Sequence, residues 1–209
     1  MHKLTLLAGA GLLALTGAAV AQQDVATDIT NAQVQAVLNS GQKSVDHTLR
    51  VLDMGSYQLS VAVVKRGPTG QRRAGAAPQR PANAVPCGVK ALPAGSKPPA
   101  GGGISHDDTV ETYIVIQGSG TLVTGGQIMN GMRSGPDSEV TKILNGPSCS
   151  GQIVGNYVAR KVTVGDISVI PAGVAHGWTD IPAGGVTYLS VRPDPKKVLE
   201  HGYVNPAIK

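Results

Sequence analysis

The segment after residue 170 places an imidazole, an indole and a carboxylate at every second position. Apolar residues occupy 167–170, a Pro-Ala-Gly sequence interrupts them, and a second β-type run follows. This pattern predicts a strand, a tight turn and another strand. Because successive side chains of a strand point to opposite faces, we expect His176, Trp178 and Asp180 to share one inward face. Imidazole and carboxylate groups bind metal ions or transfer protons, and these residues alone leave both chemistries open.

A second group of the same chemical type lies earlier in the chain, around His106 and Glu111. Two β-type runs joined by a Gly-Ser-Gly sequence at 118–120 follow it. We interpret these runs as a strand, a hairpin and a second strand. Alternation places Glu111 and Tyr113 on the same face of the first strand. A carboxylate and a phenol are therefore predicted to point in one direction.

The later segment resembles the second sequence motif of the cupin superfamily. That motif fixes a glycine, a proline, a second glycine and a histidine, and usually ends in asparagine. Gly165, Pro171, Gly173 and His176 match these positions, and Asp180 stands in place of the asparagine. The match extends over a long run of residues and points to a β-barrel fold.

The earlier segment resembles the first cupin motif in a partly degenerate form. In that motif two histidines precede a glutamate, and a glycine follows the glutamate after six residues. Glu111 and Gly118 have this spacing, His106 takes the place of the second histidine, and Ile104 occupies the place of the first. A rival alignment makes His106 the first histidine and Asp108 the second. It leaves too short a gap to Glu111, so we prefer the former.

The resemblance covers about residues 49–192 and is to small, single-domain, type-2-like cupins. It implies an all-β fold, the jelly-roll double-stranded β-helix, with a pocket inside a small barrel. A capping box at 30–33 adds a short N-terminal helix over about 30–40. The predicted organisation is an N-terminal segment at 22–46, the cupin barrel at 47–194 and a C-terminal tail at 195–209.

The resemblance also implies a metal site. Cupins with the full pattern hold a divalent ion through three histidines and a glutamate, of which this chain retains His106, Glu111 and His176. Two imidazoles and one carboxylate suit Fe, Mn, Ni, Co or Zn and leave coordination positions open. An unpaired inward carboxylate in an apolar barrel is costly, and this cost is a further argument for a bound cation.

The function implied by the resemblance is that of a metal-dependent enzyme acting on a small organic molecule. Oxygenase, isomerase and lyase chemistry all remain open, and the catalytic residues are unknown. The alternative is a non-catalytic barrel that binds small molecules in the periplasm. Three aromatic residues are candidates for the pocket walls, with core packing as the equal alternative: Tyr113, Trp178 and Tyr188.

The start of the chain predicts export. A weakly cationic start, an apolar run over 4–20 and an Ala-x-Ala site ending at residue 21 are typical of a secretory signal peptide, residues 1–21. The mature protein is then periplasmic or secreted. Cys87 and Cys149 would meet an oxidising compartment, so we predict a disulfide between them.

Composition limits the partners. The net charge of +5 comes from dispersed Lys and Arg without interleaved aromatic residues, which argues against nucleic-acid binding. No run beyond the signal peptide is apolar enough for a membrane span, and a homodimer remains open. Residues 67–103 are rich in Pro and Gly with little periodicity, and they are predicted to form one long loop, either a lid or a disordered insertion.

Overall fold

The computed structural model of the protein describes residues 25–70 and 84–209. The predicted signal peptide at 1–21 lies outside these residues, as does part of the predicted long loop. Among the described helices, none has the length and apolar character needed to cross a membrane.

Nine strands and two short helical segments make up the described chain. In order they are α1 (Asn31–Leu38), β1 (Asp46–Asp53), β2 (Gln58–Arg66), β3 (Pro86–Cys87), β4 (Lys97–His106), β5 (Glu111–Arg133), the π-helical segment η1 (Val140–Leu144), β6 (Ser148–Thr163), β7 (Ile167–Ile170), β8 (His176–Thr179) and β9 (Val186–Asp194).

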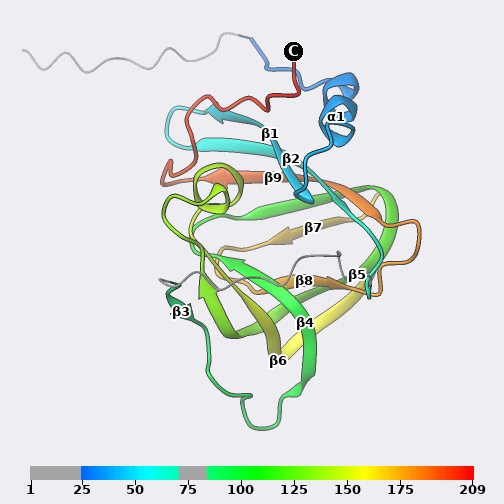
Figure 1. Cartoon of the computed structure of the whole chain (residues 1–209), viewed down its shortest axis with the longest axis vertical. Coiled ribbons are helices and arrows are strands. Elements are labelled where there is room, and N and C mark those ends of the chain that lie inside the picture. The colour runs from blue at the N-terminus through cyan, green and yellow to red at the C-terminus, as the bar shows by residue number, and fades with distance from the viewer. Residues whose placement is uncertain (1–24, 71–83) are drawn as a thin grey trace, which may run out of the picture.

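The strands form two layers that share β5 (Figure 1). In one layer the order is β1–β2–β9–β5, with β7 on the other side of β5. In the other layer β5 pairs with β6, β6 with β4, and β4 with β8, which pairs with β5 again. All of these pairings are antiparallel. This closed arrangement is an all-β double-stranded β-helix of the jelly-roll kind, and it confirms the predicted fold class.

The predicted hairpin at 118–120 is wrong. β5 continues through it as one strand of 23 residues, pairing with β9 before it and with β6 after it. Gly118 has φ of 74°, and a Cβ there would lie 2.0 Å from the carbonyl oxygen of Gly185. The left-handed glycine therefore bends the strand from one layer into the other without reversing it.

The predicted loop at 67–103 is too long. β4 begins at Lys97, and its Gly-rich part, 101–103, pairs with residues 151–153 of β6. A Cβ on Gly103 would come within 2.4 Å of the Ile153 side chain. Glycine is thus required there by the close approach of the neighbouring strand rather than by a turn.

The predicted disulfide is confirmed. Cys87 in β3 and Cys149 in β6 are bonded, with their Cα atoms 6.0 Å apart. Cys149 lies opposite Ser105 of β4, one residue before His106. The bond therefore fixes the start of β6 beside the strand that carries a candidate ligand.

The predicted N-terminal helix is confirmed as α1. The Thr30 side chain accepts from the Gln33 amide, and the Gln33 side chain accepts from the Thr30 amide, forming the capping box. Val34 and Val37 of α1 pack against Leu49 of β1, outside the barrel interior. The helix covers the outer side of the β1–β2 end of the sheet (Figure 1).

The predicted strand, turn and strand after residue 165 are observed as β7 and β8. His176 and Trp178 point inward and are buried, as alternation indicated. Asp180 does not follow them: it lies just beyond β8, is exposed, and has φ of 48°. Because β8 ends at Thr179, the alternation of side chains stops before Asp180, and the carboxylate does not point inward.

Candidate metal centre

Three strand ends bring His106, Glu111 and His176 together inside the barrel. His106 ends β4, Glu111 begins β5 and His176 begins β8. The exposed fraction of each residue is 2% or less. Their candidate ligand atoms all lie within 4.8 Å of one another. The structure therefore assembles the three residues that the resemblance selected.

The imidazole of His106 is held in one tautomer. Its Nδ1 lies 2.8 Å from Ser148 Oγ, and the Ser148 hydroxyl donates its own hydrogen to the carbonyl of Gly146 at 2.8 Å. Since that hydrogen is already used, Nδ1–H of His106 must donate to Ser148. The unprotonated Nε2 then faces Glu111 Oε2 at 3.2 Å.

The imidazole of His176 is oriented in the same way by the backbone. Its Nδ1 lies 2.9 Å from the carbonyl oxygen of Val174, which can only accept, so Nδ1 carries the hydrogen. Its Nε2 is buried and makes no hydrogen bond, although Glu111 Oε2 is only 2.9 Å away. A buried polar atom without a hydrogen-bond partner, next to a carboxylate oxygen, fits a position where both atoms bind one cation.

The donor set fits a metal ion. Both Nε2 atoms lie close to Glu111 Oε2, and the second nitrogen of each ring is hydrogen-bonded, as in most metal-binding histidines. Ligands about 2.1 Å from an ion in octahedral geometry are about 3 Å apart along an edge. The separations of 3.2 and 2.9 Å between the nitrogens and Oε2 match such edges.

Glu111 is nevertheless not the unpaired carboxylate that the sequence suggested. Arg192 Nε donates to its Oε1 at 2.7 Å, and Asn145 Nδ2 and Ser190 Oγ donate to the same oxygen at 3.1 and 3.2 Å. Tyr113 donates to Oε2 at 2.8 Å. The argument that an uncompensated charge on Glu111 requires a metal is therefore wrong. The short distances from both Nε2 atoms to Oε2 are the argument that replaces it.

Burial and charge set the protonation states of the site. Burial acts to raise the pKa of Glu111, but the positive charge of Arg192 outweighs it and holds that pKa well below its usual range. Burial also lowers the pKa of His106, partly opposed by Glu111. The site thus favours an ionised carboxylate and a neutral imidazole, the forms that bind metal.

Sequence reasoning missed the residues that support Glu111. Arg192 spans two acids, the buried Glu111 and the partly exposed Asp46, since its Nη2 also donates to Asp46 Oδ2 at 2.7 Å. Alternation along β9 placed it on the face of Tyr188, so an inward cation could have been predicted. Asn145 lies just after the π-helical segment η1, and its Nδ2 lies 3.1 Å from both His106 Nε2 and Glu111 Oε1. Nothing in the sequence pattern pointed to it.

The structure also places the two residues on which the alternative alignments differ. Ile104 lies opposite His176 in the β4–β8 pairing, and alternation puts it on the same face as His106. Asp108 is partly exposed and pairs with Lys196 at 2.8 Å, outside the group of three ligands. The geometry favours the alignment in which Ile104 replaces the first histidine.

The three aromatic pocket candidates pack mainly against one another. The ring centroids of Tyr113 and Tyr188 are 4.3 Å apart, and those of Trp178 and Tyr188 are 5.2 Å apart. All three belong to the main core cluster. Burial raises the pKa of both tyrosines, with Glu111 adding to the shift at Tyr113. Of the three, Tyr113 contacts the centre directly, through its hydrogen bond to Glu111.

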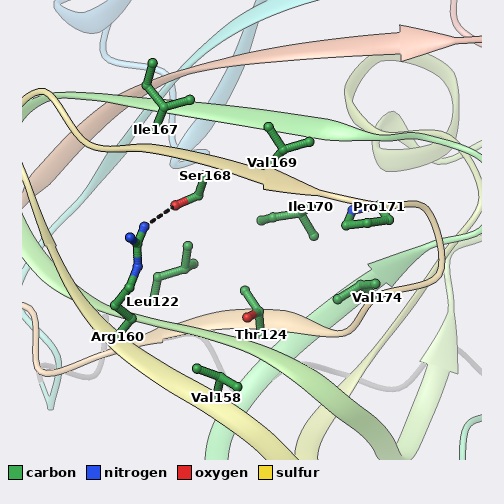
Figure 2. A pocket seen from close by; sticks show the side chains of 10 residues that line it. All are labelled: Leu122, Thr124, Val158, Arg160, Ile167, Ser168, Val169, Ile170, Pro171 and Val174. Atoms are coloured by element: carbon green, nitrogen blue, oxygen red, sulfur yellow. Dashed lines mark hydrogen bonds between the residues drawn. The ribbon is translucent and has the colours of Figure 1, made fainter.

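A cavity of about 340 Å³ lies beside the centre, between β7 and the paired strands β5 and β6 (Figure 2). None of the three ligands or the three aromatic residues lines it. Its wall contains the cross-strand neighbours of the ligands: Ile170 is paired with Glu111, and Thr124 is paired with His176. The cavity therefore adjoins the centre through one layer of side chains.

Comparison with known proteins gives structural matches only. No family profile and no curated protein sequence matches the chain. A protein of Bacillus halodurans, BH2720, shares 14% identity over 89% of this chain and 93% of its own, with a TM-score of 0.38. A Klebsiella pneumoniae protein with a double-stranded β-helix domain shares 12% over 72% and 79%, with a TM-score of 0.34. A recombinant oxalate oxidase in complex with glycolate shares 14% over 87% and 72%, with a TM-score of 0.37.

The strand topology and the buried residues define the class. The chain is an all-β double-stranded β-helix of the jelly-roll kind, with a disulfide and a buried His-Glu-His cluster that could hold a metal ion.

Proposed function

We propose that this protein is an exported metal-binding cupin and that it acts as a metal-dependent enzyme on a small organic molecule. His106, Glu111 and His176 would hold one divalent ion of Fe, Mn, Ni, Co or Zn. The observation that carries the proposal is the close approach of both Nε2 atoms to Glu111 Oε2, with the Nε2 of His176 buried and without a hydrogen-bond partner. The bound ion would supply Lewis acidity towards a ligand in an open coordination position.

The surrounding residues keep the centre in one arrangement. Ser148 and the Val174 carbonyl fix the two imidazole tautomers, and Arg192 keeps Glu111 ionised and occupied at Oε1. Glu111 would therefore bind through Oε2 alone, as a monodentate ligand. A centre with only three protein ligand atoms leaves room for substrate.

Export is supported by two features. The disulfide fits an oxidising compartment, where such bonds persist. The Ala-x-Ala site at 19–21 predicts a mature chain that begins at Gln22. N-terminal sequencing of secreted protein checks this, and a retained Met1 would refute it.

A non-catalytic small-molecule-binding barrel is the second candidate. It is favoured by the cavity, which approaches the centre without including any of its three ligands. The two candidates share the same metal site, and turnover of a bound ligand distinguishes them.

Elemental analysis of the purified protein tests the metal site. We expect close to one equivalent of a divalent metal in the wild type and its loss in His176→Ala. His201→Ala is the matched control, because His201 is 69% exposed and lies outside the cluster. Wild-type protein that holds no metal even after reconstitution contradicts the proposal.

A further inference from the structure

One charged side chain lines the cavity beside the centre. Among the described residues of its wall, most are apolar, Thr124 and Ser168 are neutral and polar, and Arg160 alone is charged. Figure 2 shows the Arg160 side chain reaching from β6 towards Ser168 on β7, on the side of β7 to which Ile170 also points. The cavity thus combines an apolar lining with one cation at its edge.

The direction of Arg160 follows from its place in β6. It is paired with Leu122 of β5 and lies two residues before Val162, and both of these neighbours belong to the main core cluster. Arg160 therefore projects from the same face of its strand as Val162, but at a position where the side chain is exposed. Lys161, the next residue, projects from the opposite face.

The guanidinium of Arg160 is largely free to bind a ligand. Its Nη2 donates to Ser168 Oγ at 3.0 Å, and this is its one hydrogen bond to the described residues. No acidic group in the described chain forms an ion pair with it, in contrast to Arg133 and Arg192. A guanidinium has five N–H donors in a planar fork that matches a carboxylate.

The hydrogen bond also bridges the two layers of the barrel. β6 belongs to the layer that contains β4 and β8, whereas β7 pairs with β5 in the other layer. Ser168 lies on the same face of β7 as Ile170, which is buried in the core and is paired with Glu111. A ligand that displaced Ser168 from Arg160 would therefore lie between the layers, close to the candidate centre.

We propose that this cavity is a binding site for small organic monocarboxylates, with Arg160 binding the carboxylate and the apolar wall binding a hydrocarbon body. This inference names the substrate class of the proposed function and rests on it for the link to catalysis. Binding itself needs only the cavity and Arg160. It therefore predicts a measurable affinity with or without metal at the neighbouring centre.

Calorimetry with hexanoate tests the site, in protein as purified and after treatment with a chelator. The fluorescence of Trp178 gives a second readout, because it is the one tryptophan in the sequence and is paired with Leu122 in the cavity wall. Hexanamide removes the charge from the ligand, and inorganic phosphate removes its apolar body. We expect hexanoate to bind and both comparison compounds to bind at least about tenfold more weakly, since a charged hydrogen bond and buried apolar surface each contribute to affinity on that scale.

Three variants locate the binding. Arg160→Gln should weaken hexanoate binding about tenfold or more, and Lys161→Gln, which removes the same charge one residue away, should leave it unchanged. Ser168→Ala breaks the bridge but frees the guanidinium, so binding should persist or tighten. Loss of binding in Ser168→Ala as well as Arg160→Gln would assign the effect to the bridge and overturn the proposal.

Other outcomes are also decisive. Equal binding of hexanamide or phosphate, or unchanged affinity in Arg160→Gln, refutes a carboxylate site at Arg160. Binding that disappears with the chelator, or in His176→Ala, places the carboxylate on the metal and refutes the assignment to Arg160. If the protein holds no metal but hexanoate binding requires Arg160, the proposed metal-dependent enzymatic function is refuted and the carboxylate site at Arg160 is supported.

Discussion

Arg192 Nε donates to Glu111 Oε1 at 2.7 Å, and both side chains are 1% exposed. The same guanidinium reaches Asp46 Oδ2 at 2.7 Å, so one buried cation lies between two acids. The ion pair between Arg192 and Glu111 compensates the charge of the Glu111 carboxylate without any metal. It also leaves Oε2 as the oxygen that faces the two imidazoles.

Removing the cation should destabilise the fold. Arg192→Met leaves a buried carboxylate without its main partner, and we expect a loss of about 3–5 kcal/mol in the free energy of unfolding, measured by urea denaturation. Arg133→Met is the matched control, because Arg133 pairs with Asp107 at the surface and should cost no more than about 1 kcal/mol. Equal effects of the two variants would contradict the structural role given to Arg192.

Stability should fall with acidification in two stages. The pKa of His106 is lowered in the folded state, so the unfolded chain binds more protons and stability falls as pH drops below about 6.5. The pKa of Glu111 is lowered well below its usual range, so its stabilisation is present above about 4.3 and is lost as pH falls towards the folded value. Denaturation across this range, in metal-free protein, measures both stages.

The variant Glu111→Gln isolates the second stage. It removes the carboxylate but retains an oxygen that accepts a hydrogen bond from Arg192. The free energy of unfolding should therefore depend less steeply on pH below about 4.3. The stage near 6.5 should remain. An unchanged acid limb would show that other carboxylates dominate it.

Parts of the fold and of the site were predictable because they depend on local patterns. The capping box predicted α1, and the Pro-Ala-Gly break predicted β7 and β8. The two-residue period placed Glu111 and His176 inside. These signals depend on neighbouring residues and need no knowledge of the tertiary structure.

The predictions of a hairpin at 118–120 and of a loop through residue 103 were wrong because glycines there allow contacts between strands that are distant in sequence. Gly118 bends β5 between the layers, and Gly103 allows β4 to approach β6, yet both read as turns or loops in the sequence. Asn145 reaches the centre from beyond a π-helical segment, whose position depends on the whole barrel. Such placements follow from packing rather than from periodicity.

Ser148 should matter for metal affinity although it would not touch the ion. It accepts from His106 Nδ1 and so keeps Nε2 unprotonated, and loss of such a partner typically lowers metal affinity 10- to 100-fold. We expect this for Ser148→Ala in a calorimetric metal titration. Ser150→Ala, an exposed position two residues along β6, should bind normally. Normal affinity in Ser148→Ala would mean that this hydrogen bond does not control the ligand.

The disulfide should contribute to global stability. Its cysteines are 62 residues apart in sequence, and closing a loop of this length stabilises by about 4 kcal/mol in the chain-entropy description. The double variant Cys87→Ala/Cys149→Ala should therefore unfold at lower denaturant concentration. Intact-mass analysis after alkylation should show two modified thiols only under reducing conditions. Modification without reductant would exclude the bond in solution.

The missing histidine leads to a final prediction about metal affinity. Ile104 is opposite His176 and on the face of His106, so Ile104→His would place a third imidazole beside the other ligands. A fourth protein ligand should tighten metal binding and also occupy a position that a substrate would need. Any metal-dependent turnover should then decrease although the affinity for metal rises.

Asp108→Ala provides the matched test of the alternative alignment. Asp108 pairs with Lys196 at the surface, so its removal should leave metal binding unchanged. Titrating wild type, Ile104→His and Asp108→Ala with the same metal separates the two alignments. If Asp108→Ala abolishes binding and Ile104→His has no effect, the ligand set is centred on a different residue, and the assignment of His106 as the second histidine is wrong.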